Sequence, residues 1–181
     1  LLADIVRRPA FPDHEIERVR KEWIAGIARE KTSPDALAMR VLPPLLYGDG
    51  HPYAIPFSGS GTEASIVALT RDDLVAYHRD IVRPDNATII VTGAVTPATI
   101  LPLLERHFGD WPVPVDASPV KREIPAATQA TGARVYLIDR PGAPQTAILA
   151  GQLMPSSLAP DRIELNTAND VLGGTFTSRI N

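Results

Sequence analysis

The sequence predicts an α+β fold in which a mixed sheet is flanked by helices. Segments with helical spacing of apolar residues occupy most of residues 1–82, and a nearly continuous β-branched run spans residues 86–95. Two shorter apolar runs lie on either side of the turn "RPGAP" at residues 140–144. Helices combined with few strands are typical of the α+β class.

Composition excludes several classes of function. The 181 residues suit one large domain or parts of two, and a net charge of −3 does not favour nucleic-acid or membrane binding. The absence of cysteine excludes disulfides and thiolate metal sites. No signal-peptide pattern is visible, and both ends lie in mid-pattern, so we expect a piece of a longer protein.

The first part of the chain reads as consecutive helices. A helix over residues 1–8 ends at "RPAFP", and Asp13 is a candidate N-cap for a helix over residues 14–31. The next helix begins at Pro34 and is expected to end near Leu42, before two prolines. The longer helix carries an apolar stripe formed by Ile16, Val19, Trp23 and Ile27.

The middle of the chain contains a loop, two capped helices and a strand. Residues 47–65 read as a long loop, and Thr70 with Asp73 forms a variant capping box for the helix that follows. Residues 86–95 read as a buried strand, and Thr96 caps a helix that closes at Gly109.

The character of the chain changes after Trp111. Residues 113–133 are proline-rich and polar, without periodicity, and are interpreted as a linker. Two short strands around the turn then lead into a helix over residues 161–172, which is closed by two glycines. We therefore expect three parts: residues 1–112, residues 113–133 and residues 134–181.

The residues by themselves reveal no active site. The four histidines do not have the spacing of a zinc helix, and His51 is expected to pack beside Pro52 and Tyr53. No serine lies in a nucleophile elbow. We accordingly assign no catalytic, cofactor-binding or metal-binding residue. The residues considered were His14, His51, His78, His107, Ser58, Ser60, Ser65 and Ser178.

Several stretches, in their order and spacing, resemble one family, the insulinase/pitrilysin/mitochondrial processing peptidase zinc metallopeptidases. They are "IERVRKEWIAGIAREKTSP", then "HPY", "GTEASI", "LTRDDL", "PDNAT" and "FGDW", and finally "VYLIDRPGAPQTAILAG" with "NDVLGGTFTSRIN". The resemblance implies parts of two similar α+β lobes of a clamshell. A zinc-bearing half of such a clamshell uses an H-x-x-E-H helix and a glutamate from a second helix.

The resemblance places the second ligand helix in this chain. In catalytic members the glutamate stands eight residues before the proline that opens the next helix, and that position here is Gly26. A glycine offers no oxygen to a metal and costs a helix interior up to about 1 kcal/mol against alanine. We therefore interpret the chain as a non-catalytic, substrate-enclosing half with no zinc of its own, although zinc belongs to the family's catalytic half.

Three alternatives stay open. Gly26 could serve close helix packing in an active zinc endopeptidase whose H-x-x-E-H lies upstream, with Glu22 or Glu30, one turn away, as the ligand. The chain could be a structural core-type subunit without a proteolytic role, or an unrelated binding module. The resemblance implies a zinc-bearing half or subunit and an extended peptide as partners, and relatives in bacteria suggest a periplasmic location.

Overall fold

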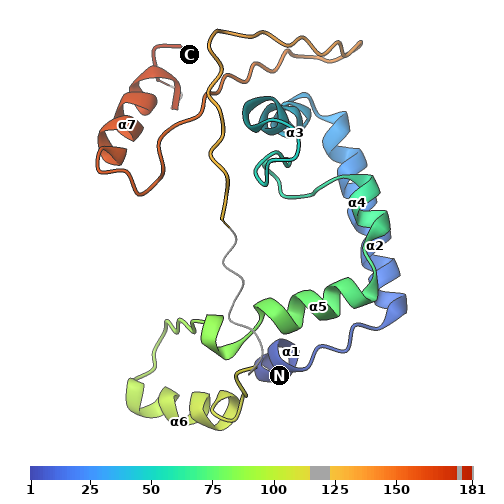
Figure 1. Cartoon of the computed structure of the whole chain (residues 1–181), viewed down its shortest axis with the longest axis vertical. Coiled ribbons are helices and arrows are strands. Elements are labelled where there is room, and N and C mark those ends of the chain that lie inside the picture. Colours follow the sequence, from blue (N-terminus) through green and yellow to red (C-terminus); the bar gives the residue numbers. More distant parts are fainter. Residues whose placement is uncertain (115–122, 175–176, 181) are drawn as a thin grey trace.

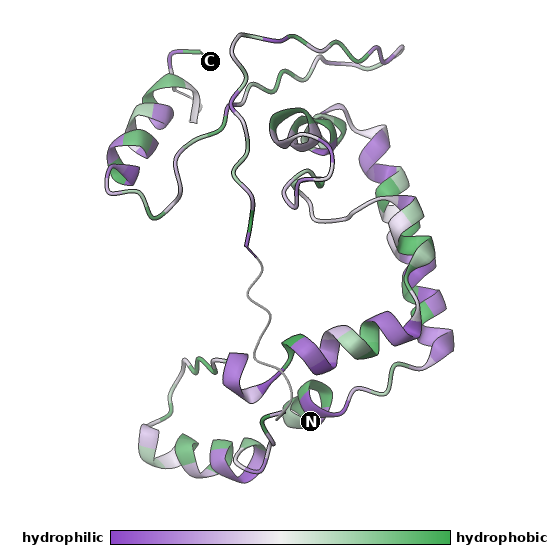
Figure 2. Ribbon diagram, in the orientation of Figure 1, coloured by the Kyte–Doolittle hydropathy of each residue, from purple (hydrophilic) through white to green (hydrophobic). Residues whose placement is uncertain are grey.

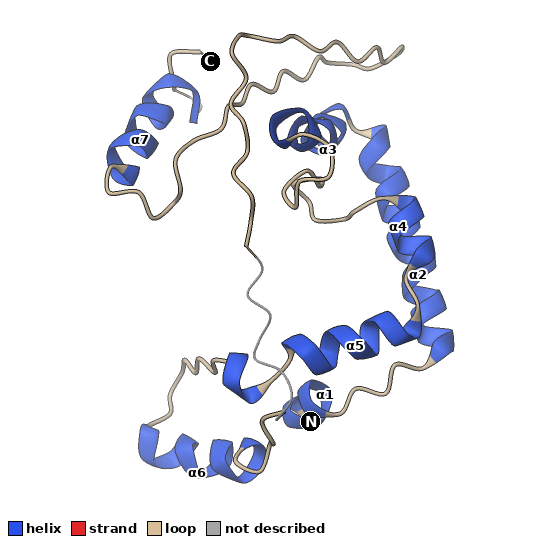
Figure 3. Ribbon diagram, viewed as in Figure 1, coloured by secondary structure: helices blue, strands red, loops and turns tan. Residues whose placement is uncertain are grey.

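The computed structural model describes residues 1–114, 123–174 and 177–180, and within these ranges it contains helices, turns and extended segments but no strand (Figure 3). The predicted α+β fold with a mixed sheet is therefore wrong for the part of the chain that the structure describes. The predicted linker at residues 113–133 falls partly outside the described residues; the remainder has neither helix nor strand.

The first two helices follow their predicted positions closely. Helix α1 spans Leu2–Arg7, and helix α2 spans Asp13–Thr32. The predicted N-cap is displaced by one residue: Pro12 occupies the cap position, and Asp13 lies in the first turn, where its negative charge complements the helix dipole. Ile27, from the predicted apolar stripe, is completely buried.

Helix α3 spans Pro34–Tyr47 and does not end before its two prolines, contrary to the prediction. Pro43 has no N–H to donate to the carbonyl of Met39 four residues earlier. The amide of Phe57, from the following loop, donates to that carbonyl at 3.2 Å instead. An outside donor thus replaces one hydrogen bond that the proline removes, and the helix continues to Gly48, whose φ is 81°.

Two capping boxes begin the next helices. Helix α4, Glu63–Ala68, was not predicted; Thr62 and Ser65 cap it reciprocally. Helix α5, Arg71–Ile81, begins as predicted, with the amide of Thr70 donating to Asp73 at 2.8 Å. A short 3₁₀ turn, η1, covers Pro84–Asn86. Both boxes satisfy amides that a helix end otherwise leaves without partners.

The three predicted strands are extended or irregular segments without sheet pairing. No backbone hydrogen bond joins residues 134–139 to residues 146–153, nor does one join either of these to residues 87–92, among the described residues. Their β-branched composition favours extended backbone, but a strand requires a partner that supplies a ladder of hydrogen bonds. In Figure 1 the two later segments form a long excursion that returns at the turn following Arg140.

The remaining helices lie apart from the group formed by α2, α3 and α4. Helix α6 spans Pro97–Phe108, with Thr96 at its N-cap as predicted and Thr99 completing a capping box. Helix α7 spans Arg162–Asn169 and is followed by the short π-helix η2, Asp170–Gly174. Helix α2 packs against α3 and α4, whereas α6 and α7 lie elsewhere (Figure 1). Hydrophobic and hydrophilic residues alternate along α2 and α6 in Figure 2.

Candidate functional site

The candidate site lies on α2 around Gly26. The helix places Glu22, Gly26 and Glu30 at successive intervals of four residues, so all three lie along one side. A Cβ atom added at Gly26 would meet no atom nearer than Nη2 of Arg29, at 3.9 Å. Within the part of the chain that the structure describes, no neighbouring helix packs closely against this position.

Glu22 faces solvent at the N-terminal side of the site. Its side chain is 65% exposed, and Arg18 donates from Nη1 to its Oε1 at 2.8 Å. Arg18 also donates to Glu15, so one guanidinium serves two carboxylates on the outer face of α2. Surface pairs of this kind contribute little to stability, and they hold Glu22 in an outward arrangement.

Glu30 lies at the C-terminal end of the site, where several hydrogen-bond donors surround its carboxylate. Arg40, from α3, and the hydroxyl of Ser60 both donate to its Oε2; the hydroxyl contact measures 2.8 Å. The hydrogen bond from Arg40, aided by the hydroxyls of Ser60 and Ser58, holds the pKa of the Glu30 carboxyl below its usual range. Partial burial opposes this shift without overcoming it.

The same network fixes the loop that follows α3. Arg40 also donates to Oγ of Ser60 at 2.7 Å and to the carbonyl of Gly61 at 2.7 Å. The indole of Trp23 donates to the carbonyl of Ser60 at 3.0 Å, and Ser60 is only 8% exposed. We name Glu30, Arg40 and Ser60 the α2–α3 polar network. In the structure the Glu30 carboxylate serves as a structural counter-ion to Arg40.

Sequence reasoning did not single out Arg40, although a signal was present. Arg40 is the one charged residue in the apolar stretch "ALAMRVLPPLL" of α3. A charged side chain in such a stretch is buried at high cost unless it has a partner. That consideration could have directed the search to an acid on the neighbouring helix, and Glu30 is such an acid.

The histidines are dispersed rather than gathered. His14 is exposed near Glu15, and Nε2 of His78 contacts the carbonyl of Val6 at 2.7 Å. His51 packs beside Tyr53 as predicted and also stacks on Tyr47. The described residues contain no group of three or more His, Cys, Asp or Glu that could hold a metal ion.

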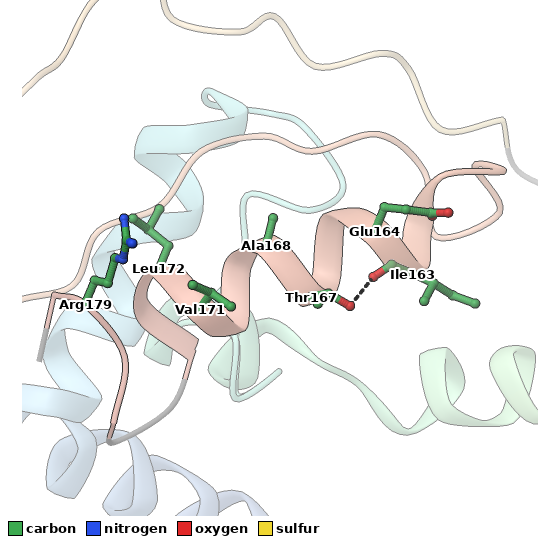
Figure 4. Close-up of a pocket in the computed structure, with 7 residues that line it drawn as sticks. All are labelled: Ile163, Glu164, Thr167, Ala168, Val171, Leu172 and Arg179. Carbon is green, nitrogen blue, oxygen red and sulfur yellow. Dashed lines mark hydrogen bonds between the residues drawn. The ribbon is translucent and has the colours of Figure 1, made fainter.

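A second surface feature is an open groove along α7 (Figure 4). Its lining is mainly apolar and includes one acid and one base, and the hydroxyl of Thr167 donates to the carbonyl of Ile163 within the helix at 2.8 Å. No polar groups converge in it as a small-molecule site would require. The lining residues are Ile163, Glu164, Thr167, Ala168, Val171, Leu172 and Arg179.

Comparison with known proteins gives consistent matches. Residues 68–181 match the family model described as the peptidase M16 inactive domain. The crystal structure of a peptidase M16 inactive domain from Pseudomonas fluorescens is similar to 70% of the chain, with a TM-score of 0.59 and 26% identity; the match covers 29% of that chain.

Two relatives extend the comparison. An uncharacterized zinc protease of Mycobacterium leprae is 31% identical over 99% of this chain. A probable mitochondrial-processing peptidase subunit beta of Schizosaccharomyces pombe is 30% identical over 60% of this chain. The chain spans 39% of the length of the mycobacterial relative and 23% of the yeast one.

These matches define a protein of the zinc-peptidase-like class. The chain belongs to the peptidase M16 family, and residues 68–181 belong to its inactive domain, the non-catalytic part of such proteins. The predicted family and the predicted non-catalytic character are thereby confirmed. No helix in the described ranges combines the length and apolarity needed to cross a bilayer.

Proposed function

We propose that the chain is part of a non-catalytic half that encloses an extended peptide and assists its cleavage by a zinc-bearing half or subunit. The observation that carries this proposal is Gly26 on α2. Its Cβ position is open, so an acid would fit there, yet the sequence provides none. A zinc ion needs three protein ligands and a water at a catalytic site, and about 2 Å separates metal from oxygen.

The surroundings of the two neighbouring acids support the same proposal. Glu22 is directed outward by Arg18, and Glu30 is bound by Arg40 and Ser60. Recruiting Glu30 to a metal would leave Arg40, whose side chain is largely buried, without its counter-ion. Neither acid is therefore a ready substitute for the ligand that is missing at Gly26.

The proposal includes a division of the chain into parts of two lobes and a connecting segment. Residues 1–112 would form the latter part of one lobe, residues 113–133 the connection, and residues 134–181 the start of a similar lobe. The change of composition after Trp111 supports this division. The mycobacterial and Pseudomonas relatives support a bacterial origin.

Metal analysis tests the proposal directly. We expect the purified full-length polypeptide to contain no stoichiometric zinc, to leave a fluorogenic peptide uncut, and to raise the cleavage rate when a zinc-bearing half is added. Glu22→Gln should leave the zinc content unchanged, as should the matched control Glu17→Gln on the same helix. Stoichiometric zinc that is lost in Glu22→Gln or in Glu30→Gln would overturn the proposal in favour of an active endopeptidase.

The same assay separates a structural role from an assisting one. A core-type subunit would assemble stably with its partners and leave the cleavage rate of a zinc-bearing half unchanged. We expect stimulation, since the family match is to a peptidase domain. Stable assembly without stimulation would contradict the enclosing role while leaving the absence of zinc intact.

A further inference from the structure

The loop after α3 contacts the later part of the predicted linker, residues 113–133, through one histidine. Nε2 of His51 lies 2.9 Å from the carbonyl oxygen of Pro125, a residue 74 positions later in the chain. The ring stacks on Tyr47 with centroids 5.1 Å apart and meets Tyr53 at 5.6 Å. His51 therefore joins α3, its loop and the predicted linker at Pro125.

The hydrogen bonds of His51 determine where its proton lies. The amide of Tyr53 donates to Nδ1 at 3.0 Å, so Nδ1 must present a lone pair. A carbonyl can only accept, so the contact with Pro125 requires a proton on Nε2. Both contacts are made together only by the neutral ring with its proton on Nε2.

Protonation of the ring would place two donors against each other. The imidazolium carries a proton on Nδ1, which would face the amide of Tyr53. The surrounding backbone is already fixed, because the amide of Ala54 donates to the carbonyl of His51 at 2.8 Å and the amide of His51 donates to Gly48 at 3.4 Å. The ring, rather than the turn, must therefore rotate, and rotation moves Nε2 away from Pro125.

Other contacts of the later region with the first helices do not respond to protonation near neutral pH. Arg140 donates to the carbonyl of Lys31 at 2.7 Å, and the backbone of Gly151 lies close to the side chain of Leu42. A guanidinium stays charged in proteins, and the second contact is apolar. We therefore expect lower pH to break the contact at Pro125 and to leave the contacts of Arg140 and Gly151 in place.

Few groups of the described residues, which leave out 115–122, surround the ring. Among them, Tyr47 of α3 and Tyr53 of the loop are the titratable side chains that face it. Asp49 precedes His51 by two residues and Glu123 precedes Pro125 by two, and neither is hydrogen-bonded to the imidazole.

We propose that His51 is a proton-sensitive latch that holds residues 123–130 against the loop after α3 while the imidazole is neutral and releases them when it is protonated. The folded contact requires the neutral ring, so the latch is closed at higher pH and opens as the pH falls. This inference does not depend on the proteolytic role proposed above.

Distance measurements by pulsed electron paramagnetic resonance test the latch. The chain contains no cysteine, so spin labels at Asp35→Cys and Thr128→Cys, both exposed positions, are specific. We expect one narrow distance distribution at about pH 7.5 and loss of that component at about pH 5 in the full chain. An unchanged or narrower distribution at the lower pH would overturn the proposal, because it would mean that acid does not release the contact with Pro125.

Three variants make the test specific to His51. His51→Gln supplies an amide donor that does not titrate, so its distribution should lose the pH response. His51→Ala removes the donor and should give the broad distribution at both pH values. His14→Gln changes an exposed histidine elsewhere and should keep the response of the parent. A pH response that persists in His51→Gln, or a narrow distribution in His51→Ala at the higher pH, would also overturn the proposal.

Discussion

Two regions of this chain treat their apolar side chains in opposite ways. In the group formed by α2, α3 and α4, Ile27 of α2 is completely buried and Pro43 of α3 is fully buried as well. In residues 134–158, large apolar side chains remain exposed despite equally strong hydrophobic patterning. Their exposed fractions are 94% for Val135, 93% for Leu137, 89% for Ile148 and 91% for Leu158.

The difference shows that hydrophobic patterning is enough to form a packed helix but not enough to form a paired strand. A helix satisfies its own backbone, so α2 can pack against two neighbouring helices and bury Ile27 there, although Val19 and Trp23 of the same stripe stay exposed. An extended segment leaves its N–H and C=O groups for a partner strand, and an isolated pair of strands is at best marginally stable in water. The first region therefore buries a small part of its apolar surface where its helices meet, and the second leaves its large apolar side chains exposed.

The largest expected effect comes from the buried side chain. Ile27→Ala removes packing at a fully buried position and should lower the free energy of unfolding by about 3 kcal/mol. Ile148→Ala, at an exposed position, should change it by less than about 0.5 kcal/mol. Urea denaturation followed by Trp23 fluorescence in a Trp111→Phe background measures both. Equal losses at the two positions would contradict the comparison.

Disrupting the α2–α3 polar network should have the second-largest effect on the free energy of unfolding. Arg40→Met removes hydrogen bonds to Glu30, Ser60 and Gly61 and should cost about 2 kcal/mol. Arg18→Met is the matched control on the exposed face and should cost less than about 0.5 kcal/mol. The same denaturation experiment applies. A cost for Arg18→Met as large as for Arg40→Met would mean that burial does not distinguish the two arginines.

Acid should weaken the first region through Glu30. The pKa of this carboxyl is lowered in the folded chain, chiefly by the hydrogen bond from Arg40. Its contribution to stability is therefore present above the usual unfolded value of about 4.3 and is lost as the pH falls through the folded value. Thermal unfolding between neutral and acidic pH should show this loss. Glu30→Gln should flatten the dependence, and an unchanged slope would show that other carboxyls, such as Asp73, account for it.

A substitution at Gly26 should have the smallest effect on the free energy of unfolding, and it should stabilise rather than destabilise the chain. Gly26→Ala adds a methyl group where the nearest atom is 3.9 Å away and should stabilise the chain by about 1 kcal/mol through helix propensity. Denaturation by urea measures the gain. A clear loss of stability would mean that α2 or its neighbours approach this position more closely than the structure shows.

The sequence was sufficient for features that are local and insufficient for those that depend on distant partners. The bounds of α2, to within a residue or two, and the capping box of Thr70 follow from spacing and residue type. The Arg40 contact with Glu30 and the continuation of α3 through Pro43 require groups that lie on other elements. The predicted strands were wrong for the same reason, because β-propensity does not supply a partner.

The main-chain contact between Phe57 and Met39 has a consequence for which substitutions α3 can accept. The link is made through the amide of residue 57, so it persists whatever non-proline side chain stands there. A residue other than proline at position 43 would bring a second N–H to the Met39 oxygen, whose two lone pairs can accept from both. Position 57 is therefore constrained through its backbone alone, because proline is the residue that would remove the hydrogen bond between the loop and α3.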